Sequence, residues 1–119
     1  MAYQTEKGIK RLINACIFSA AGYKAAWQNE EAFRLEVIIL LVSTPIALWL
    51  GDNTIEKLLL IGSIVLVVLV ELLNSAIEAV VDRIGLERHE LSGRAKDIGS
   101  AAVNASLIWA AITWIALLT

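Results

Sequence analysis

Cysteine, histidine and charged residues are all scarce in this chain of 119 residues. The single cysteine, Cys16, excludes an internal disulfide and a zinc site built on cysteines. The single histidine, His89, has no second ligand at metal-binding spacing and is interpreted as a solvated loop residue. Charged residues make up 18% of the chain and the net charge is −2, so no basic face can neutralise several phosphates. The composition therefore excludes nucleic acid as a partner.

What the chain has in excess is apolar side chains. Hydrophobic residues make up 58% of it, and its mean hydropathy of +0.70 is too high for a soluble protein of this size. Three stretches, residues 32–50, 55–84 and 93–118, are long and apolar enough to cross a bilayer as helices. Helical spacing of apolar residues over 5–30 predicts an amphipathic helix in the membrane interface, the alternative being a surface helix on a soluble core. We expect one all-α membrane domain over residues 1–119.

Lysine and arginine are distributed unevenly about the three expected spans. Four of them precede the first span, Arg34 lies in its first turn, and four lie in the connection 82–97, whereas only Lys57 falls on the opposite side. By the positive-inside rule, this asymmetry places the N-terminus and the 82–97 loop in the cytoplasm. The C-terminus is then expected on the outer, periplasmic side.

The second half of the middle span carries a stripe of polar residues. Their spacing of i, i+3, i+4, i+7 and i+11 places them within about 100° of one helix face. They are Glu71, Asn74, Ser75, Glu78 and Asp82. An ionisable side chain at membrane depth costs about 2.5–3.5 kcal/mol on insertion and is by default interpreted as functional. Polar contacts between packed helices can also explain such residues, so the pattern favours catalysis or transport and leaves packing open.

The charged residues near the cytoplasmic end suit phosphoryl chemistry. Carboxylates are hard oxygen ligands for Mg²⁺, and lysine or arginine can hold a polyphosphate. Glu71 lies two turns, roughly 10 Å, deeper along the helix than Glu78. Glu78 could therefore hold a metal on a water-soluble phosphate donor, while Glu71 could act as a base on an acceptor embedded in lipid. The expected helix start at Ser92–Gly93 would add unpaired backbone N–H groups that favour anions.

Three segments resemble the signature motifs of the prokaryotic integral-membrane diacylglycerol kinases. They are ELLNSAIEAVVDR at 71–83, HELSGRAKDIGSAAV at 89–103, and the residues Ala25-Ala26-Trp27, Asn29-Glu30, Ala32-Phe33-Arg34 and Glu36. The resemblance extends over nearly the whole chain. It implies an interfacial helix followed by three spans, and a homotrimer whose active sites are shared between subunits. It also implies ATP-dependent phosphorylation of the primary hydroxyl of diacylglycerol, giving phosphatidic acid, at the bacterial inner membrane.

The same resemblance implies a role for each site residue. Glu71 would be the base on the lipid hydroxyl, with Asn74 beside it, and Lys96 would be the charge for the γ-phosphate. Glu30 and Glu78 would bind the Mg²⁺ that bridges the ATP phosphates. Nucleotide contacts are implied at Arg11, Glu30, Glu78, Glu87, Arg88, His89, Lys96 and Asp97. Contacts to the lipid are implied at Lys24, Trp27, Arg34, Glu71 and Ser100. The phosphoryl group would pass directly and in line.

The N-terminal helix departs from the family pattern. Phe18 stands where Gram-negative members usually carry a tyrosine near the nucleotide, and Ile17 and Ala20 replace a glycine and a tryptophan. A hydroxyl contact to ATP at position 18 is lost, which predicts weaker nucleotide binding or compensation elsewhere. Two alternative functions stay open at this point: undecaprenol kinase on the same scaffold, and a small multimeric transporter that uses Glu71 for proton coupling.

Overall fold

Four helices make up the computed structural model, which describes residues 7–119. They are α1 (Gly8–Asn29), α2 (Glu31–Leu50), α3 (Thr54–Ile84) and α4 (Glu90–Leu118). No strand occurs among these residues, so the expected all-α class is confirmed. The first two residues of the expected interfacial helix, Thr5 and Glu6, lie outside the described residues.

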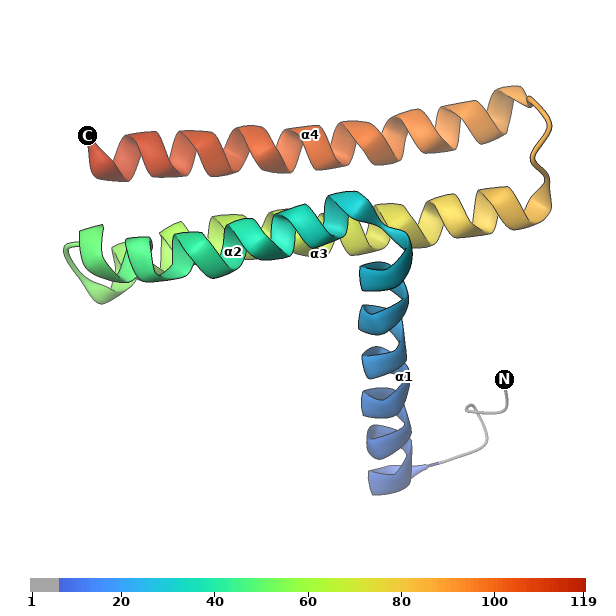
Figure 1. Ribbon diagram of the computed structural model, residues 1–119, viewed down its shortest axis with the longest axis horizontal. Helices are drawn as coiled ribbons and strands as arrows, with labels where there is room; N and C mark the ends of the chain where they lie inside the picture. Colours follow the sequence, from blue (N-terminus) through green and yellow to red (C-terminus); the bar gives the residue numbers. More distant parts are fainter. Residues whose placement is uncertain (1–6) are drawn as a thin grey trace.

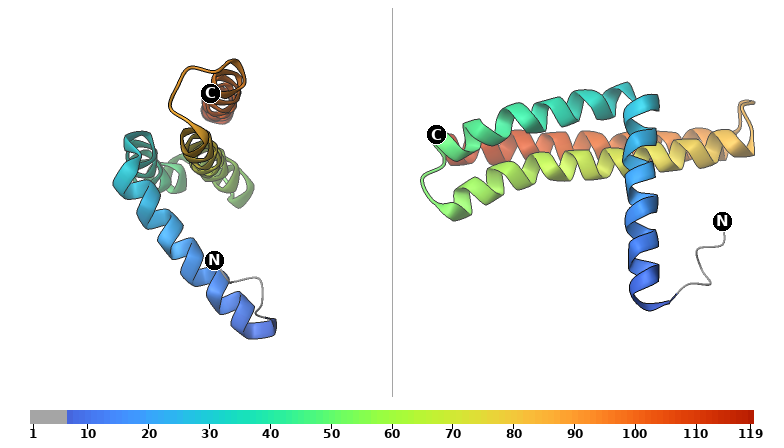
Figure 2. Two further views of the ribbon diagram at one scale, coloured as in Figure 1. Left: turned by 90° about the vertical axis from the view of Figure 1, so that its right-hand side faces the viewer. Right: turned by 60° about the horizontal axis from the view of Figure 1, so that its bottom comes forward.

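The three long helices lie side by side, with α3 in the middle. Figures 1 and 2 show α2 and α4 on two sides of α3, and α3 packs against both of them. Each of the three is apolar and long enough to cross a membrane, with 20, 31 and 29 residues respectively. In contrast, α1 leaves the bundle crosswise from the start of α2 (Figure 1). A helix that lies in the plane of a membrane interface has this orientation relative to helices that cross the membrane.

Very little apolar surface is buried within the chain. Leu60 is the only large side chain that is fully buried in the described part, and most other buried residues are small. Leucine, isoleucine and valine side chains are exposed along all three long helices, and Trp49 at the end of α2 is 81% exposed. Lipid tails are as apolar as these side chains and can cover them in place of a protein core. A small buried apolar core is therefore expected of a chain that is embedded in a bilayer.

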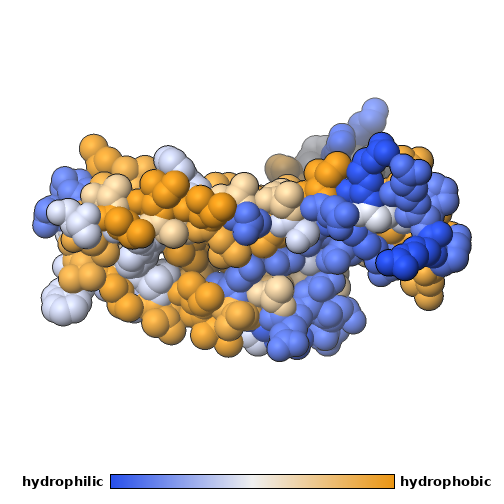
Figure 3. Space-filling model, turned by 90° about the horizontal axis from the view of Figure 1, so that it is seen from above, coloured by the Kyte–Doolittle hydropathy of each residue, from blue (hydrophilic) through white to orange (hydrophobic). Residues whose placement is uncertain are grey.

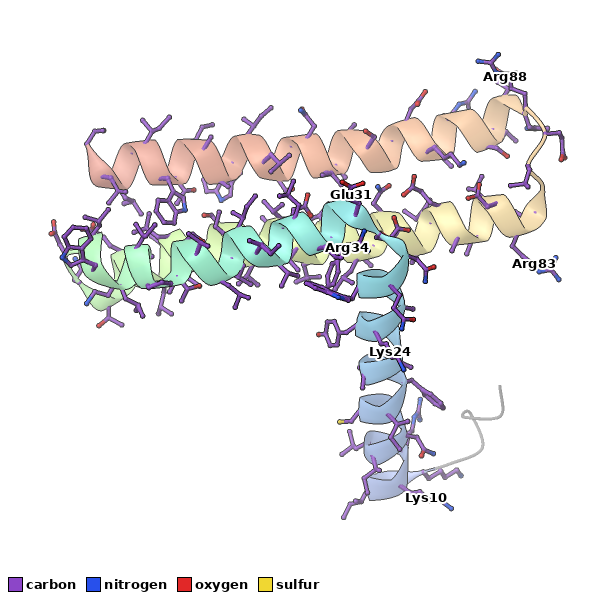
Figure 4. The ribbon with its side chains drawn as sticks, viewed as in Figure 1. Lys10, Lys24, Glu31, Arg34, Arg83 and Arg88 are labelled. Atoms are coloured by element: carbon purple, nitrogen blue, oxygen red, sulfur yellow. The ribbon has the colours of Figure 1, made fainter. Side chains whose placement is uncertain are left out.

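Polar residues gather at one end of the bundle. Figure 3 shows a largely hydrophobic body and a hydrophilic end, where α3 connects to α4. Arg83 and Arg88 lie at this end, and Lys10 and Lys24 project from α1 (Figure 4). The basic residues that the positive-inside rule uses therefore occupy α1, the corner between α1 and α2, and this one end of the molecule.

Side chains define where α3 and α4 begin. The Asn53 side chain accepts a hydrogen bond from the Glu56 N–H at 2.9 Å and so caps α3, while Gly85 follows its last residue. The His89 imidazole Nδ1 accepts from the Leu91 N–H at 3.1 Å. His89 is exposed in the connection between α3 and α4, as expected, and it is also the N-cap of α4.

This cap changes the expected start of the last helix. α4 begins at Glu90, one turn before the expected Ser92–Gly93 start. The Gly93 N–H donates to the His89 carbonyl oxygen at 2.9 Å. The expectation that Gly93 presents an unpaired N–H group to an anion is therefore wrong, because the additional turn of helix satisfies it.

Candidate active site

The corner between α1 and α2 presents Glu30. It is the single non-helical residue between the two helices, with φ −121° and ψ 106°. The Arg34 guanidinium reaches back across the corner and donates a hydrogen bond of 2.6 Å to the Trp27 carbonyl oxygen. Figure 4 shows Arg34 at this junction. The contact joins the last turn of α1 to the first turn of α2 and so fixes the position of the Glu30 backbone.

Glu30 lies in a field of negative charge. Partial burial raises the pKa of its carboxyl group above the ordinary value of 4.5, and the carboxylates of Glu78, Glu71 and Asp82 raise it further. All three belong to the polar stripe of α3. The structure therefore brings the corner residue and the stripe together, although they are more than 40 positions apart in the sequence. This grouping is a place where a cation is favoured.

One lysine extends from α4 to this stripe. The Lys96 ammonium Nζ lies 2.8 Å from the Asp82 carboxylate Oδ1, and the two side chains are 42% and 48% exposed. Glu78, one turn before Asp82, also interacts electrostatically with Lys96. The predicted phosphate-binding lysine thus lies at the same end of α3 as the predicted metal ligand.

Glu71 is the most buried acid of the stripe, with 4% of its surface exposed. Its Oε2 atom lies 3.4 Å from the Ser75 hydroxyl, which donates weakly to it. Glu36 of α2, which is 7% exposed, has a carboxyl group that interacts with that of Glu71. We did not identify Glu36 as a site residue from the sequence. Its signal was an isolated acid immediately before the apolar run of α2.

Asn74 of α3 lies against Gly99 of α4. Its Oδ1 atom is buried and has no hydrogen-bond partner within residues 7–119. Gly99 of α4 faces it, and a Cβ atom on Gly99 would overlap Oδ1. The glycine therefore allows α4 to approach the Asn74 side chain at this level. A larger residue at position 99 would require the helices or the carboxamide to move.

Three grooves lie beside the polar residues of α1, α3 and α4 described above. The first, of about 530 Å³, runs between α1 and α3 and includes Glu30 and Ser75 in its lining. The second, of about 210 Å³, lies where α3 connects to α4, and its lining includes several predicted nucleotide residues together with Asp82: Glu87, Arg88, His89 and Lys96. A third, of about 720 Å³, runs along α4, and its lining includes Arg88, His89, Arg94 and Asp97.

Other predicted site residues lie away from these groups. Arg11 is in the first turn of α1, at the end that projects farthest from the bundle (Figure 1). Lys24 points outward from the same helix (Figure 4), and Ser100 is exposed on α4. Arg11, Lys24 and Ser100 line none of the three grooves. Within one chain, neither Arg11, which was expected to contact the nucleotide, nor Lys24, which was expected to contact the lipid, shares a groove with Lys96.

Comparison with known proteins gives consistent matches over most of the chain. Residues 17–118 match the family model described as prokaryotic diacylglycerol kinase. The diacylglycerol kinase of Escherichia coli strain K12 is 58% identical over 111 residues, which cover 93% of this chain and 91% of that protein. That of Haemophilus influenzae is 51% identical over 90% of this chain and 91% of its own. The Pseudomonas aeruginosa protein is 46% identical over 98% of this chain and 94% of its own.

Proposed function

Because this chain belongs to the prokaryotic diacylglycerol kinase family, we propose that it transfers the γ-phosphoryl group of ATP directly to the primary hydroxyl of diacylglycerol. The product would be phosphatidic acid. The family makes the chain a lipid kinase of the membrane, with ATP as co-substrate, and so replaces the transporter alternative. The names of the relatives favour diacylglycerol over undecaprenol as the lipid acceptor.

The burial of Glu71 beside the charged end of the bundle is the observation that carries this proposal. A carboxylate there can take the proton of a lipid hydroxyl while that oxygen attacks the γ-phosphorus. Glu78 and Asp82 follow on the same helix, so the polyphosphate of the donor would lie about two turns closer to the cytoplasm. Asn74, between the two levels, would orient the acceptor. This arrangement lets a lipid in the membrane and a nucleotide in water meet at one place.

Glu30 and Glu78 are the residues that we assign to Mg²⁺. The fit rests on the field at the corner, because Glu78 raises the pKa of Glu30 and a cation would relieve that repulsion. No group of three or more potential metal-ligating side chains occurs in the described part of the chain. Mg²⁺ at phosphoryl-transfer sites needs only one or two carboxylates, since phosphate oxygens and water complete its shell. When bound, the ion would neutralise charge on the phosphates.

The nucleotide would bind at the junction of α3 and α4. Lys96 would hold the γ-phosphate, while Glu87, Arg88, His89 and Asp97 would contact the remainder of the nucleotide. Lys96 and Asp82 are both about half exposed, and such pairs are weak because water screens them. A phosphate group can therefore take the ammonium from Asp82 at little cost.

A homotrimer would complete the site. The first turn of α1 projects away from its own bundle (Figure 2), so Arg11 would approach charged residues of α3 and α4 in another subunit. We therefore propose shared sites, in which Arg11 contributes to the nucleotide and Lys24, Trp27, Arg34 and Ser100 line the lipid. The polar end of the bundle and α1 would face the cytoplasm, where ATP is available, and the C-terminus would be periplasmic.

Replacement of the base tests the proposal. Detergent-solubilised Glu71→Gln protein should keep its oligomeric state and its binding of Mg-ATP, and should phosphorylate diacylglycerol at least about 100-fold more slowly than wild type. Glu31→Gln is the matched control, because Glu31 is exposed at the start of α2 and has no proposed role. A second assay, in which undecaprenol replaces diacylglycerol, compares the rates of phosphorylation of the two lipids and so identifies the preferred acceptor. Full activity of Glu71→Gln would contradict the assignment of the base.

A further inference from the structure

Two acids that belong to different helices are buried against each other at the level of the proposed base. Glu36 on α2 is 7% exposed and Glu71 on α3 is 4% exposed, and their carboxyl groups interact directly. The second oxygen of Glu36, Oε2, is buried and has no hydrogen-bond partner in the structure from Lys7 onward. Nothing in the reaction described above uses Glu36.

Two ionised carboxylates in contact at a buried position are strongly unfavourable. Like charges in contact repel strongly where water is excluded, and paired carboxyl groups in proteins therefore share one proton. The other charged groups near the pair offer no relief. The charged group that acts on Glu36 is Glu71 itself. Glu30, Glu78 and Asp82 are all acids, Lys96 is paired with Asp82, and the Arg34 guanidinium is directed to the Trp27 carbonyl oxygen. A single proton held between the two carboxyl groups would remove this repulsion.

We propose that Glu36 is a positioning residue whose protonated carboxyl group donates a hydrogen bond to the Glu71 carboxylate. This bond keeps Glu71 ionised at membrane depth and fixes which of its oxygens is free to face the lipid hydroxyl. The inference deepens the proposed function and rests on it. During transfer the O–H bond of the lipid breaks and its proton passes to Glu71. The lipid oxygen bonds to the γ-phosphorus while the bond from that phosphorus to the β,γ-bridging oxygen breaks, and ADP leaves with that electron pair. Glu36 keeps its own proton throughout.

The pH dependence of turnover distinguishes this role from simple packing. Glu36→Gln keeps the size of the side chain and an N–H donor, whereas Glu36→Leu removes every donor. With diacylglycerol and Mg-ATP saturating, we expect the acidic limb of the kcat profile to move up by about one pH unit in Glu36→Leu. Turnover on that limb then falls roughly tenfold. Glu36→Gln should stay within about half a unit of wild type, since its amide replaces the donor.

Infrared spectroscopy gives a readout that needs no activity. Wild type at pH 7 should show the C=O stretch of a protonated carboxyl group that is missing from Glu36→Gln. This measurement remains available if Glu36→Leu does not fold. An unchanged band in Glu36→Gln would overturn the inference, as would an acidic limb in Glu36→Leu that coincides with wild type. Equal limb shifts in both variants would also overturn it, because the donor would then be irrelevant.

The Glu71→Gln variant distinguishes a failure of the proposed function from a failure of the role assigned to Glu36. If Glu71→Gln transfers phosphate at the wild-type rate, the proposed function loses its base, whatever Glu36 does. If Glu71→Gln is inactive and the carboxyl band does not depend on Glu36, only the role of Glu36 is overturned.

Discussion

The Lys96 ammonium and the Asp82 carboxylate join α4 to α3 across 2.8 Å at the charged end of the bundle. Each partner lies near a residue with a proposed role in catalysis, because Glu78 precedes Asp82 by one turn and Asp97 follows Lys96. The pair is about half exposed, so it contributes little to the stability of the fold. In this arrangement the lysine lies beside the place where we expect the polyphosphate.

The two partners should therefore differ in their effect on turnover. Lys96→Met removes a positive charge from the transferred phosphoryl group and should lower kcat roughly 100-fold. Asp82→Asn leaves the lysine in place and should change kcat by no more than about threefold. Initial rates at varied ATP concentration measure both effects, and thermal unfolding in detergent checks that both variants are folded. Equal losses in the two variants would mean that the ion pair itself is required, and not the free charge of Lys96.

Glu30 gives the protein a predictable pH dependence in the absence of metal. Burial and the neighbouring acids raise the pKa of its carboxyl group above 4.5 in the folded state. In the range between the two pKa values the folded chain binds more protons than the unfolded chain, so stability falls as the pH rises through it. With EDTA present at pH 7, Glu30→Gln should therefore raise Tm, by an amount on the order of 2 °C. The gain should vanish near pH 4, where Glu30 is protonated in both states.

In EDTA at pH 7, Glu30→Gln should have a higher Tm than wild type, and addition of Mg²⁺ should reverse this order. The ion should stabilise wild type at pH 7 and lose affinity as the pH falls, because protons compete for Glu30. Glu30→Gln should respond much less, while Glu31→Gln, which changes an exposed neighbour, should respond like wild type. The measurement is the shift of Tm with Mg²⁺ concentration at several pH values. A full response of Glu30→Gln would show that the ion binds elsewhere.

Local periodicity in the sequence was enough to predict the three spans and the polar stripe of α3. Glu71, Asn74 and Glu78 share a helix face in any α-helix, so no knowledge of the fold is needed to group them. The contact of Glu36 with Glu71 is different, because it depends on how α2 packs against α3. The approach of Glu30 to the stripe likewise depends on the corner that Arg34 closes. The helix start at Glu90 was missed because histidine is an unusual N-cap residue.

The contact between Asn74 of α3 and Gly99 of α4 predicts a sensitivity to side-chain size at Gly99. A Cβ atom there would overlap the Asn74 Oδ1 atom, so Gly99→Ala must displace the carboxamide or the helix. We expect kcat to fall roughly tenfold or more, since a small misplacement near reacting groups is costly. Gly62→Ala in α3 is the matched control, because a Cβ atom there has open space within the chain. Wild-type kcat in Gly99→Ala would mean that the position of Asn74 does not limit turnover.

At the opposite end of the bundle, Trp114 should contribute to stability without affecting catalysis. Its indole Nε1 donates a hydrogen bond of 3.1 Å from α4 to the Leu60 carbonyl oxygen of α3. That oxygen also accepts from the Ser63 hydroxyl at 2.8 Å, so it keeps a partner when the indole is removed. Hydrogen bonds between membrane helices contribute about 0.6 kcal/mol on average. Trp114→Phe should therefore lower the free energy of unfolding in mixed micelles by about that amount.

Its kcat should remain at the wild-type value, because Trp114 lies more than four helical turns along α4 from Lys96. Trp49→Phe is the control, since Trp49 is 81% exposed and donates no hydrogen bond across α3 and α4. Unfolding of Trp49→Phe should match wild type in mixed micelles. If Trp114→Phe instead lost activity in proportion to stability, the outer halves of α3 and α4 would be coupled to the site. The two ends of the bundle could then not be treated as independent.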